Sequence, residues 1–319
     1  MENEVNIIEP SQTELAVTNP VEEKKKNTLK FELTKGIISY LLFQNFVLVV
    51  AIIAMLFFEL DLEHVPTLLT LDLVSSGLLS VIYLVLYKDL VIEDKNRIKE
   101  QGIQGLKTFF SSCVKGFISF MVVKMIAGMA EGWLFDILGL EYETSENQSL
   151  IEELTGSAPL LMTISACIMA PINEELIFRG MVGKIIKNKK VFITVSGLIF
   201  GLVHVTDSLV LIFEIVALGL IIDWCLNNKS IDKNERIQLS VMMAVILLII
   251  CGGLYYFQYG NLILKITTLN LTEVLGSITY IIMGLYLAYV YAKHNSILLN
   301  MGIHSLNNIF SMAIILFFM

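Results

Sequence analysis

Apolar residues are grouped in long runs, and short charged stretches separate one run from the next. Most of these runs approach the roughly 20 residues that an α-helix needs to cross the hydrocarbon core of a membrane. Nine such runs cover residues 37–58, 67–87, 108–138, 157–183, 191–206, 209–226, 238–257, 273–292 and 296–318. The pattern predicts an all-α fold, a polytopic membrane helical bundle of about eight to nine transmembrane helices.

The charged stretches alternate in sign along the chain. Lysine and arginine occur in residues 24–35, 88–107, 184–190 and 229–236 and at Lys293, whereas the stretches 59–63 and 141–153 are acidic. Basic loops stay on the cytoplasmic side of membrane proteins. We therefore expect a multi-pass protein of the cell membrane with a cytoplasmic N-terminus.

The chain divides into three parts by its polarity. Residues 1–34 are polar and lack the short apolar core of a signal peptide, so they are expected to form a disordered cytoplasmic tail. Residues 35–107 contain two spans and a cytoplasmic loop, and residues 108–319 form the core of the bundle.

Composition supports the membrane assignment and excludes other classes. The 319 residues are 55% hydrophobic and only 16% charged, with a mean hydropathy of +0.73 and a net charge of -8. No basic stretch is interleaved with aromatic residues, so nucleic acid is not expected as a partner. Cys113, Cys167, Cys225 and Cys251 all lie in apolar runs without a CxxC pair, which argues against a disulfide framework or a cysteine zinc site.

Three of the runs carry ionisable side chains at membrane depth. The run Asn173–Gly180 contains Glu174 and Glu175, and two others contain His204 and His304. Counted at about 1.5 Å per residue from Lys187, Lys190 and Lys293, respectively, Glu174, His204 and His304 lie about 16–21 Å deep. Because ionisable groups are costly at this depth, they indicate a shared polar site, and hydrolysis is the leading hypothesis for it.

Adjacent helical residues point about 100° apart, so Glu174 and Glu175 cannot face the same cavity. Glu175 and Arg179 are four residues apart, which predicts a structural ion pair. Glu174 has no basic partner at this spacing and is the candidate general base.

His304 and Asn308 are also four residues apart and share a helix face. Together they can offer two N–H groups to one cavity, as the stabilisation of an oxyanion requires. Asn307 points about 100° away, and we interpret it as a packing residue or a polar contact between helices.

Other readings of these residues remain open. Two histidines and a carboxylate from three helices can bind zinc, although the HExxH motif is absent. Serine catalysis is disfavoured because GxSxG is absent. The other charges within the runs can pair between helices or contact a substrate, and pairing is the expectation: Asp72, Lys115, Lys124, Glu131, Asp136, Glu214 and Asp223.

In this order on separate runs, Glu174-Glu175-x-x-x-Arg179, Phe200-x-x-x-His204 and His304-x-x-x-Asn308 resemble the motifs of the CPBP family of intramembrane proteases. This family includes type II CAAX prenyl endopeptidases and bacteriocin-processing and immunity proteins. The resemblance covers about residues 108–318, with an insertion near 207–272 relative to shorter members.

The resemblance implies a metal-independent glutamate protease without a cofactor. Glu174 and His204 would activate a water, and His304 and Asn308 would stabilise the oxyanion. We therefore expect an intramembrane endopeptidase acting on a membrane-associated peptide or protein, with membrane lipid as its surroundings. The alternative is a non-catalytic membrane scaffold or bacteriocin-immunity protein that retains the motif residues. A small transporter is disfavoured because it predicts paired broken helices in two repeated halves.

Overall fold

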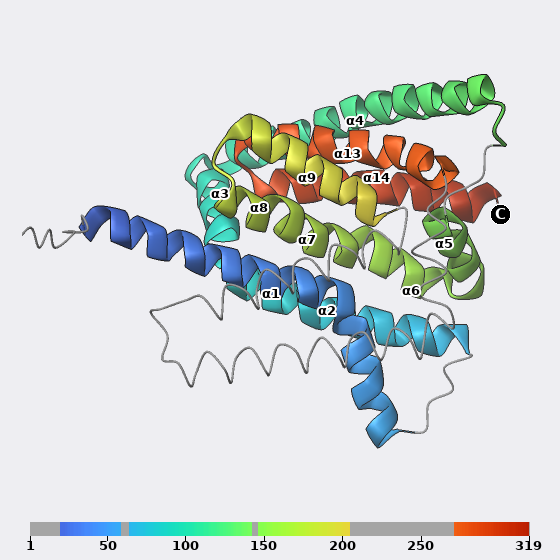
Figure 1. The fold of residues 1–319 in the computed structure, drawn as a ribbon, viewed down its shortest axis with the longest axis horizontal. Helices are drawn as coiled ribbons and strands as arrows, with labels where there is room; N and C mark the ends of the chain where they lie inside the picture. Colours follow the sequence, from blue (N-terminus) through green and yellow to red (C-terminus); the bar gives the residue numbers. More distant parts are fainter. Residues whose placement is uncertain (1–19, 59–63, 142–145, 205–270, 319) are drawn as a thin grey trace, which may run out of the picture.

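The computed structural model describes residues 20–58, 64–141, 146–204 and 271–318, and every regular element within these ranges is helical. The all-α prediction is therefore confirmed for this part of the chain (Figure 1). The expected spans 209–226 and 238–257 lie outside the described residues, as does almost all of the expected insertion near 207–272. The elements are α1 (Pro20–Phe57), α2 (Val65–Leu86), α3 (Lys88–Glu100), α4 (Gly102–Leu138), α5 (Glu146–Ser157), α6 (Pro159–Ile164), η1 (Ser165–Met169), α7 (Ala170–Glu175), η2 (Leu176–Met181), α8 (Val182–Ile185), α9 (Lys189–Val203), α13 (Leu271–His294) and α14 (Ile297–Phe318).

Six helical segments of the described chain are long and apolar enough to cross a membrane, so the protein is a multi-pass membrane protein. They are Phe31–Phe57, Val65–Leu86, Gly102–Leu138, Pro159–Ile185, Leu275–His294 and Ile297–Phe318. Helix α9 has only 15 residues, in keeping with the short run 191–206. Helix α4 has 37 residues and is about 55 Å long, well beyond the hydrocarbon thickness of about 30 Å.

Two polar stretches outside the apolar runs contain helix. Helix α1 begins at Pro20, so residues 20–34 are not the disordered tail that their polarity suggested. Glutamate, lysine and leucine are strong helix formers, and proline is tolerated in the first turn of a helix. The cytoplasmic loop of residues 88–107 contains α3, on which Glu93 and Arg97 form an i,i+4 pair at 3.9 Å.

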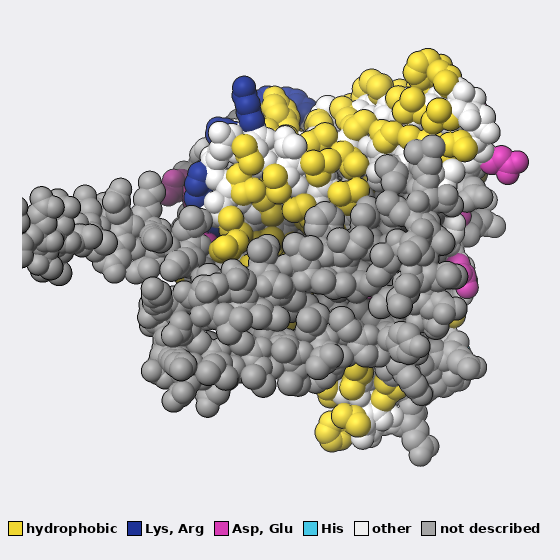
Figure 2. Space-filling view, viewed as in Figure 1, with side chains coloured by type: hydrophobic (Ala, Val, Ile, Leu, Met, Phe, Trp, Pro, Cys, Tyr) yellow, Lys and Arg dark blue, Asp and Glu magenta, His cyan; other side chains and the backbone are white. Residues whose placement is uncertain are grey.

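The segment from α6 to α8 packs against α1 and α2 as well as against helices of the C-terminal part of the chain. Helices α9, α13 and α14 pack against the segment from α6 to α8, α4 packs along α13 and α14, and α1 lies along α2 (Figure 1). Lysine and arginine side chains gather at the end where α3, α8 and α9 meet, and acidic side chains appear at the other end, near the end of α4 (Figure 2). This distribution matches the charge alternation along the sequence.

Small residues bring α9 and α13 close together. A Cβ atom on Gly201 would lie 2.5 Å from the backbone of Ile281, and one on Gly197 would lie 2.7 Å from the backbone nitrogen of Leu285. Gly197 and Gly201 form a GxxxG pair, the spacing that lets helix backbones approach in membranes. This contact fixes the end of α9, where His204 lies.

The turn between α13 and α14 is held by a buried carboxylate from α3. Asp94 is 2% exposed, and its Oδ2 accepts hydrogen bonds from Ser296 Oγ and Leu298 N, both at 2.9 Å. Arg97 donates to Asp94 Oδ1 at 2.7 Å and to two backbone carbonyls of the same turn. Asp94 therefore caps α14 from another helix and sets the position at which α14 begins.

We expect Asp94→Asn to lower the free energy of unfolding by about 2–3 kcal/mol, because it removes a charged acceptor and turns an N–H group toward other donors. Denaturation of the purified protein in detergent measures this loss. Glu93→Gln is the matched control, because Glu93 is on the same helix and exposed, and it should change stability by less than about 0.5 kcal/mol. Equal stabilities of the two variants would contradict the capping role.

Candidate active site

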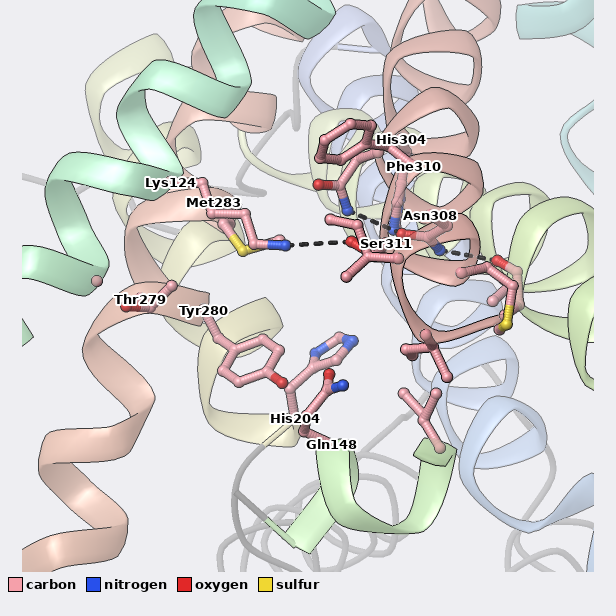
Figure 3. A pocket seen from close by; sticks show the side chains of 18 of the residues that line it. Lys124, Gln148, His204, Thr279, Tyr280, Met283, His304, Asn308, Phe310 and Ser311 are labelled. Carbon is pink, nitrogen blue, oxygen red and sulfur yellow. Dashed lines mark hydrogen bonds between the residues drawn. The ribbon is translucent and has the colours of Figure 1, made fainter. Parts of the chain in front are cut away.

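A cavity of about 660 Å³ lies between α4, the α6–α8 segment, the end of α9, α13 and α14. All four residues predicted to be catalytic line it, namely Glu174, His204, His304 and Asn308. Figure 3 shows the last three of these together with Lys124 and Tyr280 around the cavity. The packing thus brings together the three separate motifs of the sequence.

Glu174 lies between two π-helical turns, η1 and η2, with α7 between them. Pro171 is the second residue after η1 and has no backbone N–H to donate, so the regular α-helical hydrogen bonding cannot continue through it. Helix α7 is held to α2 by the residue before Glu174. Asn173 accepts a hydrogen bond from Ser80 Oγ at 2.8 Å and donates one to Ser76 O at 3.1 Å. Single π turns inside α-helices are frequent at functional sites.

The Glu174 carboxylate faces both histidines. Its Oε2 lies 3.5 Å from His204 Nε2 and 3.7 Å from His304 Nε2. These separations are longer than an ordinary N–H···O hydrogen bond, and Oε2 is buried without a hydrogen-bond partner among the described residues. This oxygen can therefore accept a proton from a molecule that enters between the three side chains.

The His204 ring is held from three sides. Its Nδ1 lies 2.6 Å from Phe200 O, so the proton on Nδ1 is donated to that carbonyl and Nε2 faces Glu174. The ring stacks on Tyr280 with centroids 5.4 Å apart and packs on Phe200 at 4.4 Å. A neutral His204 thus presents an acceptor at Nε2.

The predicted contact between Glu175 and Arg179 is present, at 3.2 Å between Oε1 and Nη1, and both side chains are fully buried. Arg179 also donates to Gly284 O at 3.1 Å, and its guanidinium lies 4.6 Å from the centre of the Phe200 ring. The pair joins the helix of Glu174 to α13 and to the ring that supports His204.

Glu175 does more than neutralise Arg179. Its Oε1 accepts a hydrogen bond from His304 Nδ1 at 2.9 Å, and its Oε2 accepts one from Asn300 Nδ2 at 3.2 Å. A carboxylate bound to one imidazole nitrogen fixes the ring so that the other nitrogen is aimed at a chosen point. Here that nitrogen, Nε2, is aimed toward Glu174 and the cavity.

The comparison with protein families adds to this geometry. A model of the type II CAAX prenyl endopeptidase Rce1-like family matches residues 156–310, which include every candidate site residue. Residues 156–310 form an Rce1-like domain. The resemblance to the CPBP family noted from the motifs is thereby confirmed. No curated protein and no solved structure matches the chain.

Asn308 of the Rce1-like domain is oriented by two neighbours. Its Nδ2 donates to Ala166 O at 2.7 Å, and its Oδ1 accepts from Asn307 Nδ2 at 2.9 Å. An amide nitrogen carries two N–H groups, so one remains for the cavity. Asn307 also borders the cavity, although it is buried and donates its hydrogen bond to Asn308.

Asn300 is the residue of this site that the sequence interpretation missed. It bridges Glu175 and Leu287 O, the latter at 2.7 Å. A signal was available, because Asn300, His304 and Asn308 recur at intervals of four residues and therefore lie along one face of α14.

Within the described residues, the expected pairing with an opposite charge is not found for Lys124 or Asp72. Lys124 donates to Ser311 Oγ at 3.3 Å, and Asp72 accepts from Ser165 Oγ at 2.8 Å. Glu131 accepts the backbone N–H of Thr279 at 2.9 Å. Lys124 and Glu131 both line the cavity.

Zinc was the main alternative from the sequence. Within the described ranges, no group of three or more His, Cys, Asp or Glu side chains is arranged to hold a metal ion. Glu174, His204 and His304 surround a common point, but they do not form such a group.

The two neighbouring carboxylates of the Rce1-like domain should differ in their effect on stability. Glu175→Gln leaves Arg179 buried without its counter-charge and is expected to cost about 3–5 kcal/mol of unfolding free energy. Glu174→Gln, the matched control, removes a carboxylate whose Oε2 has no hydrogen bond, so stability should be unchanged or raised.

Thermal unfolding of the two purified variants in the same detergent gives the comparison. A greater loss of stability in Glu174→Gln than in Glu175→Gln would show that the roles of the two carboxylates are reversed.

Proposed function

We propose that the protein is an intramembrane endopeptidase of the glutamate type, which hydrolyses a peptide bond in a membrane-associated peptide or protein without a metal. The observation that supports this most directly is Glu174 Oε2 facing the Nε2 atoms of both His204 and His304 at the cavity. The Rce1-like family match supports a membrane protease of the CAAX endopeptidase type.

In the proposed reaction, Glu174 and neutral His204 both act as acceptors toward one water. Glu174 takes a proton from this water as its oxygen attacks the peptide carbonyl carbon. The carbonyl double bond becomes a single bond, and the negative charge moves to the carbonyl oxygen. When the C–N bond breaks, the proton is passed to the leaving nitrogen, giving a carboxylic acid and an amine.

The oxyanion would be stabilised by His304 and Asn308. In the doubly protonated form of His304, Nδ1–H donates to Glu175 and Nε2–H points into the cavity. The second N–H of Asn308 supplies another donor. Donors that are already fixed stabilise the developing charge without having to reorganise during the reaction.

The protein is proposed to work in the cell membrane with its N-terminus in the cytoplasm, because its basic side chains gather at one end of the bundle (Figure 2). The proposed partners are membrane lipid and a peptide or membrane-protein substrate. The second candidate, a non-catalytic scaffold or immunity protein, would need neither an oriented His304 nor a free Glu174 oxygen.

We expect Glu174→Gln to abolish cleavage, because glutamine cannot accept the proton of water. His204→Ala should lower the rate far more than Asn308→Ala, for which the loss of one oxyanion donor predicts a fall of about 10²–10³-fold. The measurement is cleavage of a library of membrane-associated peptides, including prenylated CAAX peptides, by purified protein. His294→Ala is the control, because His294 is exposed at the end of α13, and it should keep full activity. Full activity in His204→Ala would favour the scaffold.

Chelation tests the metal-independent mechanism. Exhaustive treatment with a chelator should leave cleavage unchanged, because carboxylate and imidazole alone activate the water. Elemental analysis of the active protein should find no stoichiometric zinc. Stoichiometric zinc together with loss of activity on chelation would instead support the metalloprotease alternative.

A further inference from the structure

A second cavity, of about 180 Å³, lies between α1, the η2–α8 segment and α9, and we call it the α1 cavity. Of its eight lining residues, one is a glycine and six have Ile, Val, Met or Phe side chains. The eighth is Tyr40, whose hydroxyl already accepts a hydrogen bond from Gln44 Nε2 at 3.1 Å. A buried water needs about two to four polar partners, so these walls are suited to an alkyl chain rather than to water.

The α1 cavity lies at the depth of lipid acyl chains, near the basic end of the bundle. Of its lining residues, Ile185 is two residues before Lys187 and Phe178 is nine residues before it. At about 1.5 Å per residue, the cavity extends from about 3 Å to about 14 Å beyond this lysine. This range falls within one half of a hydrocarbon core of about 30 Å. An acyl chain of the leaflet at the basic end can therefore reach the cavity.

Three exposed lysines lie at this end of the cavity, where a short loop joins α8 to α9 (Figure 2). They are Lys187, Lys189 and Lys190. Among the described residues, no carboxylate oxygen lies within 4 Å of their ammonium groups. Lys187 Nζ donates to Gly183 O at 3.2 Å, which leaves it two N–H groups for another acceptor. The three ammonium groups can therefore meet an anion from outside the chain.

The position of two of these lysines on α9 also indicates an external anion. Lys189 and Lys190 lie in the first turn of α9, and this turn contains no acidic residue. The dipole of a helix favours negative charge at its N-terminus and disfavours cations there. An anion bound at this turn is stabilised by the lysines and by the dipole together.

We propose that the α1 cavity binds an acyl chain of an anionic phospholipid, whose phosphate lies against Lys187, Lys189 and Lys190. The apolar cavity accepts the chain, and the lysines at its polar end accept the headgroup. Basic pockets between transmembrane helices bind anionic headgroups in this way. The lipid site is separate from the proposed chemistry, because the α1 cavity shares no lining residue with the candidate active site.

The bound lipid connects parts of the chain that are distant in sequence. Its acyl chain contacts α1, the η2–α8 segment and α9 together, and η2 and α8 pack directly against α1. A ligand that binds only the folded protein raises the free energy of unfolding. The anionic lipid should therefore stabilise the protein in detergent, in addition to binding to it.

Lipid binding is measured by native mass spectrometry of the full-length protein in a neutral detergent. Phosphatidylglycerol, which is anionic, and phosphatidylcholine, which is zwitterionic, are titrated with identical acyl chains. Ile199→Phe places a larger side chain into the cavity. Leu198→Phe is the matched control, because Leu198 is the neighbouring residue on α9, is 40% exposed and does not line the cavity.

The headgroup contact has its own pair of variants. The first replaces Lys187, Lys189 and Lys190 together by glutamine. The control replaces three other lysines by glutamine, and these are exposed residues of α3 and α4: Lys95, Lys99 and Lys107. Both triple variants remove the same charge, so they separate a local site from general attraction to anionic lipid.

We expect the first phosphatidylglycerol to bind about tenfold or more tightly than phosphatidylcholine, because each basic residue near an anionic headgroup favours binding about fivefold. Ile199→Phe should weaken this binding about tenfold or more, whereas Leu198→Phe should keep it. The Lys187/Lys189/Lys190 variant should lose the preference between the two lipids, and its control should retain it. Phosphatidylglycerol should raise the Tm of the unchanged protein but not that of Ile199→Phe.

Thermal unfolding without lipid shows whether each variant is folded, and Ile185→Phe fills the same cavity from α8 if Ile199→Phe does not fold. Equal affinity for the two lipids would overturn the proposal, as would a preference that survives the loss of Lys187, Lys189 and Lys190. Equal lipid binding by the cavity-filling variant and Leu198→Phe would also overturn it, and so would a peptide or a second copy of the chain bound in place of lipid. None of these measurements depends on cleavage, so failure of the proposed function leaves their outcome unchanged.

Discussion

A carboxylate and a guanidinium that are both fully buried impose the main constraint on this bundle. Glu175 and Arg179 can remain charged only if other groups complete their hydrogen bonds, since an unpaired buried ion costs several kcal/mol. Those groups come from α13 and α14, through Gly284 O, Asn300 and His304. The need to satisfy one ion pair thus holds three segments of the chain in a single arrangement, and the proposed catalytic histidine is one of its members.

Features that depend on spacing along one helix were predictable from the sequence. The four-residue separation of Glu175 and Arg179 gave the ion pair, and the depths of Glu174, His204 and His304 placed them in one layer. Both arguments use only helix geometry, which is the same in every α-helix. The long α4 and short α9 followed equally from the lengths of their apolar runs.

Contacts between helices could not be predicted in the same way. The hydrogen bond between Glu175 and His304 depends on how α7 and α14 face each other, which no spacing within either helix determines. The π turns beside Glu174 alter the facing of that segment further. The helical start of α1 at Pro20 was missed for a different reason, because polarity was taken as a sign of disorder although the residues are good helix formers.

The two adjacent carboxylates show how one short segment separates a structural role from a reactive one. Glu175 has a hydrogen bond or ion pair at both oxygens, whereas Oε2 of Glu174 has no hydrogen bond among the described residues. Because the backbone turns about 100° between them, one side chain points into the packed interior and the other into the cavity. Glu175 binds His304 through a hydrogen bond, and His304 and His204 both face Glu174. The stability of the bundle and the reactivity of the proposed site are therefore assigned to different side chains, although these are neighbours in the sequence.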